Sequence, residues 1–249
     1  MSLWGEFDFC PKCDHNNLWL NYFYIHATNS PLINLRSTKR IGPHDINILY
    51  FIFGSLLGDS YAEKHGNGTR ICFQQEGSHS AYLLWMHTYV SHLGYCNESS
   101  PKLTTRLGFQ GKLRTILRFK TFTYASFNWI RECFYTNESG INKKILPSCI
   151  EEYLSPLALA VWIMNDGGKV SSGLKLATNN FSEQEVLTLI NILYTKYNLK
   201  SSIQHDENSA SNINKQYIIY ISKYSMSDLS HIVKPHLHPS MKYKLNGYL

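Results

Sequence analysis

Two apolar segments, each followed by an acidic residue, limit the folds that this chain can adopt. Asp45 to Gly58 and Ser155 to Asn165 are both almost wholly apolar, and both are long enough for a helix buried on more than one side. Asp59 follows the first segment, and Asp166 follows the second segment 107 residues later. Because a buried helix with the same polar end occurs twice, the sequence indicates an internal duplication.

The elements expected after each apolar helix also follow one order. After the first helix we expect a strand pair turning at 65–68, a helix over 80–93 capped by Gly94, strands over 102–109 and 112–120, and a helix over 125–135. After the second we expect strands within 169–179, a helix that opens with the capping box Ser182-x-x-Glu185, strands over 199–204 and 215–222, and a helix over 225–233. The segments that end at Lys144 and Lys244 lie 100 residues apart, which is a second marker of duplication. The fold class is therefore α+β, with an α-β-β-α-β-β-α unit twice over.

The pattern divides the chain into four parts. Residues 1–43 are rich in Asn, Pro and aromatic residues without periodicity, and we interpret them as an irregular extension. Residues 44–136 form the first unit, 137–153 a linker and 154–249 the second unit. With 43% hydrophobic residues, the 249-residue chain can bury either one large core or two small ones in contact.

The positive charge is concentrated in one stretch. The net charge is +6, and between residues 100 and 145 nine basic residues stand against two acidic ones. Such a local excess is typical of a surface that follows a phosphate backbone. A solvated face is the alternative interpretation.

The remaining composition argues against several classes of protein. The six cysteines lack the spacing of a disulfide framework, so we expect reduced thiols. Cys10 and Cys13 form a C-x-x-C pair, but two further ligands at zinc-site spacing are lacking. We find no run of ~18 apolar residues to predict a membrane span. The first thirty residues are unlike a secretory signal or an import presequence.

Asp59 and Asp166 are each expected at a helix C-terminus, where the helix dipole opposes negative charge. A divalent cation held by carboxylate and backbone carbonyl oxygens would compensate that charge. If the two helices pack side by side, both carboxylates converge on one site for phosphodiester hydrolysis. The alternative is that either residue caps a turn or pairs with a lysine. Gly54 and Gly58, four residues apart on a bulky helix, would let a second helix approach closely, or else mark a bend.

At these helices the residues resemble a known family. The stretches IFGSLLGDS (52–60) and LAVWIMNDG (159–167) resemble the two copies of the motif of the LAGLIDADG homing endonucleases. The contexts LSPLALAVWIMNDGGK (154–169) and KPHLHPSMKYKL (234–245) resemble the single-chain, intron-encoded members of organelle genomes. The resemblance covers residues 42–249. In the second motif, Val161 and Asn165 stand where the first has Gly54 and Gly58, so close packing must depend more on the first helix.

The resemblance implies a homing endonuclease fold with two pseudo-twofold-related units whose motif helices form the interface. It implies a metal-dependent endonuclease that cuts double-stranded DNA and promotes intron mobility. The metal ligands would be Asp59 and Asp166, with Gly58 and Asn165 beside them, and the ion Mg²⁺, with Mn²⁺ or Ca²⁺ as substitutes in binding. Lys144 and Lys244 match basic residues beside the active sites, where they would polarise water or stabilise the phosphate. A plain phosphate contact is the alternative for each, and for Lys244 a surface lysine near the C-terminus is another.

The antiparallel sheets would lie over the major groove. In the strand 112–120, Arg114, Ile116, Arg118 and Lys120 alternate with Leu113, Thr115, Leu117 and Phe119, which places a basic face over an apolar one. The complete set of predicted DNA contacts is Arg70, Gln74, Lys102, Thr104, Arg106, Arg114, Arg118, Lys120, Lys175, Asn179, Lys200, Ser202, Gln204 and Lys215. Because the second half is less charged, we expect unlike half-sites, a long asymmetric target and affinity that falls as salt rises.

Other functions remain open at this point. A maturase that assists the splicing of its host intron RNA could use the same basic surface, with or without cleavage of DNA. An intein-borne enzyme would be expected to end in His-Asn, and a transcription regulator to carry a further DNA-binding domain. The resemblance also implies a monomer encoded in a mitochondrial intron, with no membrane partner.

Overall fold

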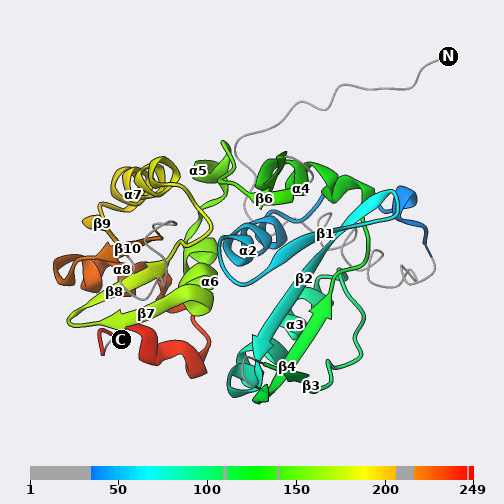
Figure 1. Cartoon of the computed structure of the whole chain (residues 1–249), viewed down its shortest axis with the longest axis horizontal. Helices are drawn as coiled ribbons and strands as arrows, with labels where there is room; N and C mark the ends of the chain where they lie inside the picture. Colours follow the sequence, from blue (N-terminus) through cyan, green and yellow to red (C-terminus); the bar gives the residue numbers. More distant parts are fainter. Residues whose placement is uncertain (1–34, 109–110, 139–140, 206–215, 246) are drawn as a thin grey trace, which may run out of the picture.

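The computed structural model describes residues 35–108, 111–138, 141–205, 216–245 and 247–249. Two α/β units lie side by side, with helices α2 and α6 adjacent at the centre (Figure 1). The first unit holds α2 (Ile46–Leu57), β1 (Tyr61–His65), β2 (Gly68–Glu76), α3 (Ser80–His92), β3 (Thr104–Leu107), β4 (Leu113–Lys120) and α4 (Asn128–Phe134). The second holds α6 (Pro156–Asp166), β7 (Gly167–Val170), β8 (Gly173–Ala177), α7 (Glu183–Tyr197), β9 (Ser201–His205), β10 (Tyr217–Ile221) and α8 (Met226–Val233).

Short 3-10 helices lie between or beside these elements. They are η2 (Ser37–Lys39), η3 (Gly77–His79), η5 (Ala125–Phe127), η6 (Lys223–Ser225), η7 (Lys234–His236) and η8 (Pro239–Leu245). The predicted order of helices and strands is confirmed in both units, and so is the α+β class. None of the helices in the described ranges is long and apolar enough to cross a membrane.

Local side-chain contacts explain where the long helices begin. Asp45 accepts hydrogen bonds from the backbone N–H groups of Asn47 (2.7 Å) and Ile48 (3.3 Å) and so caps α2. Ser155 caps α6 in the same way, with a proline in the first turn. The predicted capping box at the start of α7 is confirmed, since the Ser182 and Glu185 side chains bond each other's backbone N–H groups.

The two four-stranded sheets share one topology. Their strand orders are β1-β2-β4-β3 and β7-β8-β10-β9, and every pair is antiparallel. In the first sheet the face that carries Ile71, Phe73 and Phe119 is buried, and the rings of Phe73 and Phe119 stack with centroids 4.6 Å apart. Helix α3 packs against β2 and β4, which leaves the opposite face of the sheet open.

The close approach of α2 and α6 depends on two glycines. A Cβ atom at Gly54 would lie 2.3 Å from the carbonyl oxygen of Ala158, and one at Gly58 would lie 2.6 Å from the Cβ of Asn165. Both distances are below any real Cβ contact, so a side chain at either position would push the helices apart. Val161, which stands in the second motif where Gly54 stands in the first, is fully buried, but the residue that faces Gly54 is Ala158.

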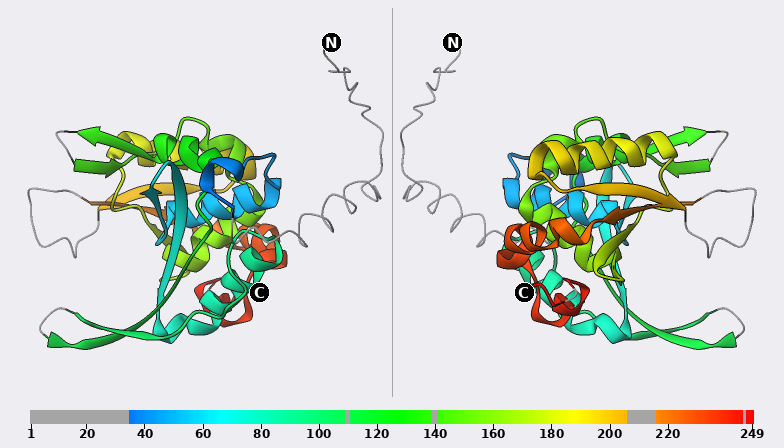
Figure 2. Two further views of the ribbon diagram at one scale, coloured as in Figure 1. Left: turned by 90° about the vertical axis from the view of Figure 1, so that its right-hand side faces the viewer. Right: turned by 90° about the vertical axis from the view of Figure 1, so that its left-hand side faces the viewer.

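Two expectations need correction. The segment predicted as a linker carries secondary structure: a hairpin of β5 (Tyr135–Glu138) and β6 (Ile141–Lys144), and the short helix α5 (Ile150–Tyr153). The basic-over-apolar alternation of β4 holds only at its inner end, because Leu113 is 72% exposed and Ile116, expected among the basic residues on the open face, is 6% exposed. The outer end of the β3–β4 hairpin projects past the helix layer (Figure 2), and Leu107 and Leu113 there are 78% and 72% exposed.

The end of the expected irregular extension is anchored to the first unit. Residues 1–34, including Cys10 and Cys13, lie outside the described residues. Arg40 is 8% exposed, its guanidinium lies 4.9 Å from the ring centroid of Phe122, and its Nη1 donates to the carbonyl of Thr123 (3.0 Å). The four described cysteines, Cys72, Cys96, Cys133 and Cys149, are free thiols.

The close contact at Gly54 predicts that alanine there destabilises the protein, which is the opposite of what helix propensity alone predicts. Alanine is favoured over glycine inside a helix by about 1 kcal/mol. Gly54→Ala should nevertheless destabilise the protein by about 1–3 kcal/mol, because the added methyl overlaps the backbone of α6. Chemical denaturation measures the free energy of unfolding. The control Asn47→Ala, at an exposed position of the same helix, should stay within about 0.5 kcal/mol of wild type. A Gly54→Ala protein as stable as wild type would contradict the packing.

Candidate active site and nucleic-acid interface

The two acidic helix ends meet. Asp166 is the last residue of α6, and Asp59 follows Gly58, the C-cap of α2. Both carboxyl groups line one cavity, and the charge of Asp59 acts on Asp166. Burial and the neighbouring charge of Asp59 raise the pKa of Asp166 to about 7, against an ordinary value of 3.8. The pair therefore forms one site at the interface of the units, as the duplication predicted, with Asp166 more buried than Asp59.

Each helix end is also held by one of the two predicted lysines. The Lys144 ammonium, at the end of β6, donates to the carbonyls of Gly58 (3.1 Å) and Ser60 (3.3 Å). The Lys244 ammonium, in η8, donates to the carbonyls of Met164 (2.6 Å) and Asn165 (2.8 Å). Each lysine thus places positive charge at the negative end of one motif helix. These contacts are with carbonyl oxygens, so neither lysine simply neutralises an aspartate.

Burial changes the protonation of both lysines. It lowers the pKa of Lys144 and of Lys244 to about 8, although the charges of Asp166 and Asp59 act in the opposite direction. Lys244 is only 4% exposed, whereas Lys144 reaches a cavity. The two lysines hold equivalent helix ends, but only Lys144 lines the space in which a substrate group could bind.

The donor set of this site fits a hard divalent cation. Two adjacent carboxylates, one with a raised pKa, repel each other, and a bound divalent cation would offset that repulsion. The carbonyls of Gly58 and Asn165 lie beside them, and each oxygen has a second lone pair besides the one that accepts from lysine. Carboxylate and carbonyl oxygens suit Mg²⁺ or Ca²⁺. The described residues include no cluster of three or more His, Cys, Asp and Glu side chains that could hold a metal ion, so backbone carbonyls would have to add to the two carboxylates.

A hydrogen-bond network from the first unit, which the sequence did not predict, holds Asp59 and Asn165. The Gln75 amide donates to Asp59 Oδ2 (2.9 Å) and to Asn165 Oδ1 (3.3 Å), and the Tyr82 hydroxyl also donates to Asn165 Oδ1 (3.2 Å). Beyond Gln75, its Oε1 lies 3.4 Å from His79 Nδ1. The sequence did carry a signal for Gln75. It follows Ile71 and Phe73 on the buried face of β2, where a polar side chain needs a hydrogen-bond partner.

A cavity of about 510 Å³ opens beside the carboxylates. Both aspartates and Lys144 line it, together with Leu57, Gly58, Ser60, Tyr61, Tyr135, Asn142, Ala177, Thr178, Asn179, Asn180 and Phe181. Asn179 was expected to contact DNA, and here it lies next to the acidic pair. The cavity draws its walls from both units and from the β5–β6 hairpin, so the segment first interpreted as a linker contributes to the site.

The open face of the first sheet gathers most of the predicted contacts of that half. The strand register aligns Arg70 with Glu63, Cys72 with Lys120, Gln74 with Arg118, Arg106 with Arg114, and Thr104 with Ile116. These residues share the face opposite Ile71, Phe73 and Phe119, although Cys72 and Ile116 on it are buried. Lys102 precedes β3 and is exposed. Arg114 is not free, because it pairs with Glu76 at 3.3 Å. The result is a basic strip that runs outward along the hairpin.

The second sheet presents a less charged face. Lys175 and Ser202 both lie opposite Tyr220 in the register, and Gln204 lies opposite Ile218. Tyr220 was not predicted, although its place between two polar positions marks it as a residue of the open face. Lys200 instead lines a separate groove of about 350 Å³ beside α7, with Tyr194 and Ser201. Lys215 lies outside the described residues.

Comparison with known proteins agrees with this geometry. Residues 49–229 match the model of the LAGLIDADG DNA endonuclease family, and the chain belongs to that family. It is 48% identical over 236 residues to the cytochrome b mRNA maturase bI2 of Saccharomyces cerevisiae, covering 91% of this chain and 55% of that protein. The protein of the same name from Debaryomyces hansenii is also 48% identical, over 94% of this chain and 88% of its own length. This chain thus spans only about half of the yeast relative.

Relatives named as endonucleases and a solved structure extend the comparison. The intron-encoded endonuclease ai4 of Dictyostelium discoideum is 38% identical over 64% of this chain and 98% of its own. The homing endonuclease I-WcaI bound to its DNA recognition sequence matches with a TM-score of 0.71 at 28% identity, covering 87% of this chain and 93% of that chain. The homing endonuclease fold that the resemblance implied is confirmed.

The shared site predicts how the metal-free protein responds to pH. The pKa of Asp166 is higher in the folded protein than in an unfolded chain, so folding is favoured below pH ~4 and this contribution is lost as pH rises through about 7. In EDTA, Asp166→Asn should therefore raise the melting temperature at pH 8 by several degrees, and by less at pH 5. A pKa shift of one unit changes the free energy of unfolding by about 1.4 kcal/mol, and each kcal/mol shifts the melting temperature by about 2–4 °C.

Exposed Glu132 supplies the matched control, because Glu132→Gln removes a carboxylate that does not line the cavity. Its melting temperature should follow wild type at both pH values. If Asp166→Asn melted like wild type at pH 8, the two carboxylates would not repel each other in the folded protein.

Proposed function

We propose that this chain is a site-specific endonuclease that hydrolyses both strands of a long, asymmetric DNA target with a divalent metal. The observation that carries this proposal is the convergence of Asp59 and Asp166 between two sheets with open faces. Membership of the family, and the likeness to a structure solved with its DNA recognition sequence, support it. The ion is Mg²⁺, with Mn²⁺ or Ca²⁺ able to replace it in binding; when bound, it supplies charge stabilisation and an acidified water.

The residues of the chain divide the remaining work. Asp59 and Asp166 hold the cation, with the Gly58 and Asn165 carbonyls beside them. Lys144 lines the cavity, so its ammonium is placed to stabilise charge on the phosphate or to polarise the attacking water. Lys244 is enclosed, and its main effect is to hold the end of α6. Gln75 keeps the Asp59 carboxylate oriented toward Asn165.

The unlike sheets support an asymmetric target. The first presents arginine and lysine to phosphates and guanine edges, whereas the second presents Tyr220, Ser202 and Gln204 around Lys175. One chain contributes both carboxylates, so it acts as a monomer. By analogy with the intron-encoded relatives, the reaction promotes intron mobility, and the protein works in the mitochondrion.

A second function is favoured by two of the similar relatives. Both proteins at 48% identity are named cytochrome b mRNA maturases. A role for this chain in splicing its host intron RNA would use the basic surface without the acidic pair. The presence of both aspartates keeps DNA cleavage first, with RNA as an additional partner.

The cleavage proposal is tested with aspartate variants. Asp59→Asn and Asp166→Asn should each abolish cleavage of an intron-free cytochrome b allele in Mg²⁺, because each removes a metal ligand. Both should retain binding in Ca²⁺ to within about tenfold, since the phosphate contacts lie on the sheets. Gel electrophoresis and mobility shift measure the two properties. The exposed variant Asp228→Asn should cut normally; full cleavage by either helix-end variant, or none by wild type, would refute the proposal.

The RNA function has a separate test. If the chain assists splicing, the double variant Asp59→Asn, Asp166→Asn should still accelerate splicing of the cognate intron transcript, because phosphodiester exchange in a self-splicing intron needs no protein carboxylate. A splicing assay with purified RNA measures the rate with and without protein. No acceleration by wild-type protein would exclude the second function and leave the first untouched.

A further inference from the structure

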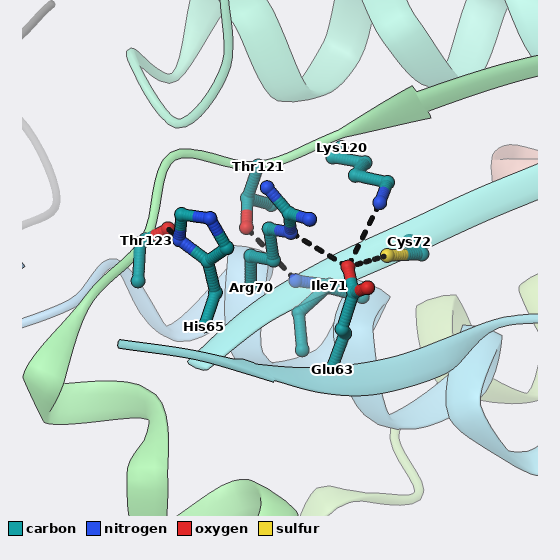
Figure 3. Close-up of polar contacts among 8 residues, drawn as sticks. All are labelled: Glu63, His65, Arg70, Ile71, Cys72, Lys120, Thr121 and Thr123. Atoms are coloured by element: carbon teal, nitrogen blue, oxygen red, sulfur yellow. Dashed lines mark hydrogen bonds and ion pairs between the residues drawn. The ribbon is translucent and has the colours of Figure 1, made fainter. Parts of the chain in front are cut away.

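One carboxylate lies among the basic side chains of the first sheet, on its edge strand β1. Glu63 Oε2 accepts hydrogen bonds from Arg70 Nε (2.6 Å), Lys120 Nζ (2.8 Å) and the Cys72 thiol (3.4 Å). Figure 3 shows the three donors pointing at the same oxygen from neighbouring strands. These residues come from β1, β2 and β4, and the register places Glu63 opposite Arg70 and Cys72 opposite Lys120.

The cluster is accessible from the open side of the sheet. The side chains of Glu63, Arg70 and Lys120 are 35%, 24% and 29% exposed. Ile71, adjacent to Arg70, points to the opposite face and is fully buried. The three charged groups are therefore neither enclosed nor fully solvated, which is the position of side chains that meet a ligand laid along the sheet.

A carboxylate at this place weakens attraction to phosphate, so affinity alone does not explain it. Two hydrogen-bonded cations hold the pKa of Glu63 down at about 2, and it therefore stays charged whenever DNA can bind. Partly exposed ion pairs contribute little to stability, typically less than about 1 kcal/mol. What the contacts do provide is order: they fix two long cationic side chains that would otherwise sample many rotamers.

The unused atoms of the cluster have a defined chemistry. Arg70 contacts Glu63 through Nε, and its two terminal nitrogens have no hydrogen-bond partner among the described residues. All three contacts to Glu63 use Oε2, and within the same ranges Oε1 has no partner. The exposed edge thus offers a bidentate donor next to an acceptor. In the major groove, a G·C pair presents the two acceptors O6 and N7 of guanine next to the amino donor of cytosine.

We propose that Glu63, Arg70 and Lys120 form one base-reading unit that recognises a G·C pair in the half-site under the first sheet. The terminal nitrogens of Arg70 donate to guanine, and Glu63 Oε1 accepts from the cytosine amino group. Lys120 neutralises the carboxylate and holds it in place. This assignment makes Glu63 a specificity-determining residue, and it rests on the proposed function of the chain as a DNA endonuclease.

The same sheet offers a matched control. Glu76 also lies on the open face and pairs with Arg114 at 3.3 Å, but these side chains are 59% and 61% exposed. Glu63→Gln and Glu76→Gln each remove one negative charge from that face. Only Glu63→Gln removes a carboxylate that holds partly buried Arg70 in one orientation.

The experiment is a binding selection from a randomised double-stranded DNA library in Ca²⁺, followed by sequencing. Wild type should enrich one site. Glu63→Gln should lose about tenfold in preference at one G·C position, and the rest of the profile should be unchanged. Arg70→Lys, which keeps the charge but not the two-pronged donor, should relax the same position. Glu76→Gln should change affinity equally for all sequences.

The outcomes distinguish failure of the base-reading unit from failure of the proposed nuclease function. If wild type enriches a site and both Glu63→Gln and Arg70→Lys keep its full profile, or weaken every sequence equally, the base-reading unit is refuted while the nuclease proposal stands. If wild type enriches no sequence at all, both are refuted. Thermal melting confirms that each variant is folded, and Arg70→Lys decides the matter should Glu63→Gln fail to fold.

Discussion

The packing of α2 against α6 is the contact on which the rest of the molecule depends. Gly54 lies against the backbone of Ala158, and Gly58 lies against Asn165, so the helices approach more closely than larger side chains would allow. Because both helices end near this contact, their terminal aspartates are brought together. The same contact places one sheet on either side of the interface (Figure 1). A small shift there would alter the acidic site and the spacing of the sheets together.

The acidic site brings together buried carboxylates and buried lysines, and the opposite charges of the two kinds of group partly offset the cost of burying them. Two carboxylates lie at the negative ends of two helices, and burial together with the charge of Asp59 raises the pKa of Asp166. Two lysines are drawn into the same region by the helix carbonyls, and burial lowers the pKa of each. A divalent cation would relieve the repulsion between the carboxylates. The repulsion that destabilises the metal-free site is thus also what favours metal binding.

Duplication has produced two units of equal topology with unequal surfaces. The first sheet carries fixed cations around Glu63, and the second carries Tyr220 and neutral polar side chains around one lysine. The active site is uneven too, since the Gln75 network comes from the first unit alone and the cavity lies on the side of Lys144. Such differences fit a protein that reads two unlike half-sites.

The sequence by itself determined the element order, the duplication and the acidic pair, because these depend on local periodicity, caps and spacing. Ser182 and Glu185 form the capping box that their local pattern predicts. Only the tertiary structure decided what depends on neighbours distant in the chain: Gln75 bonded to Asp59, Arg70 and Lys120 joined by Glu63, and Lys200 turned toward α7. Alternation assigns a side chain to a face, but it does not show where the covering helix stops, which is why Leu113 is exposed.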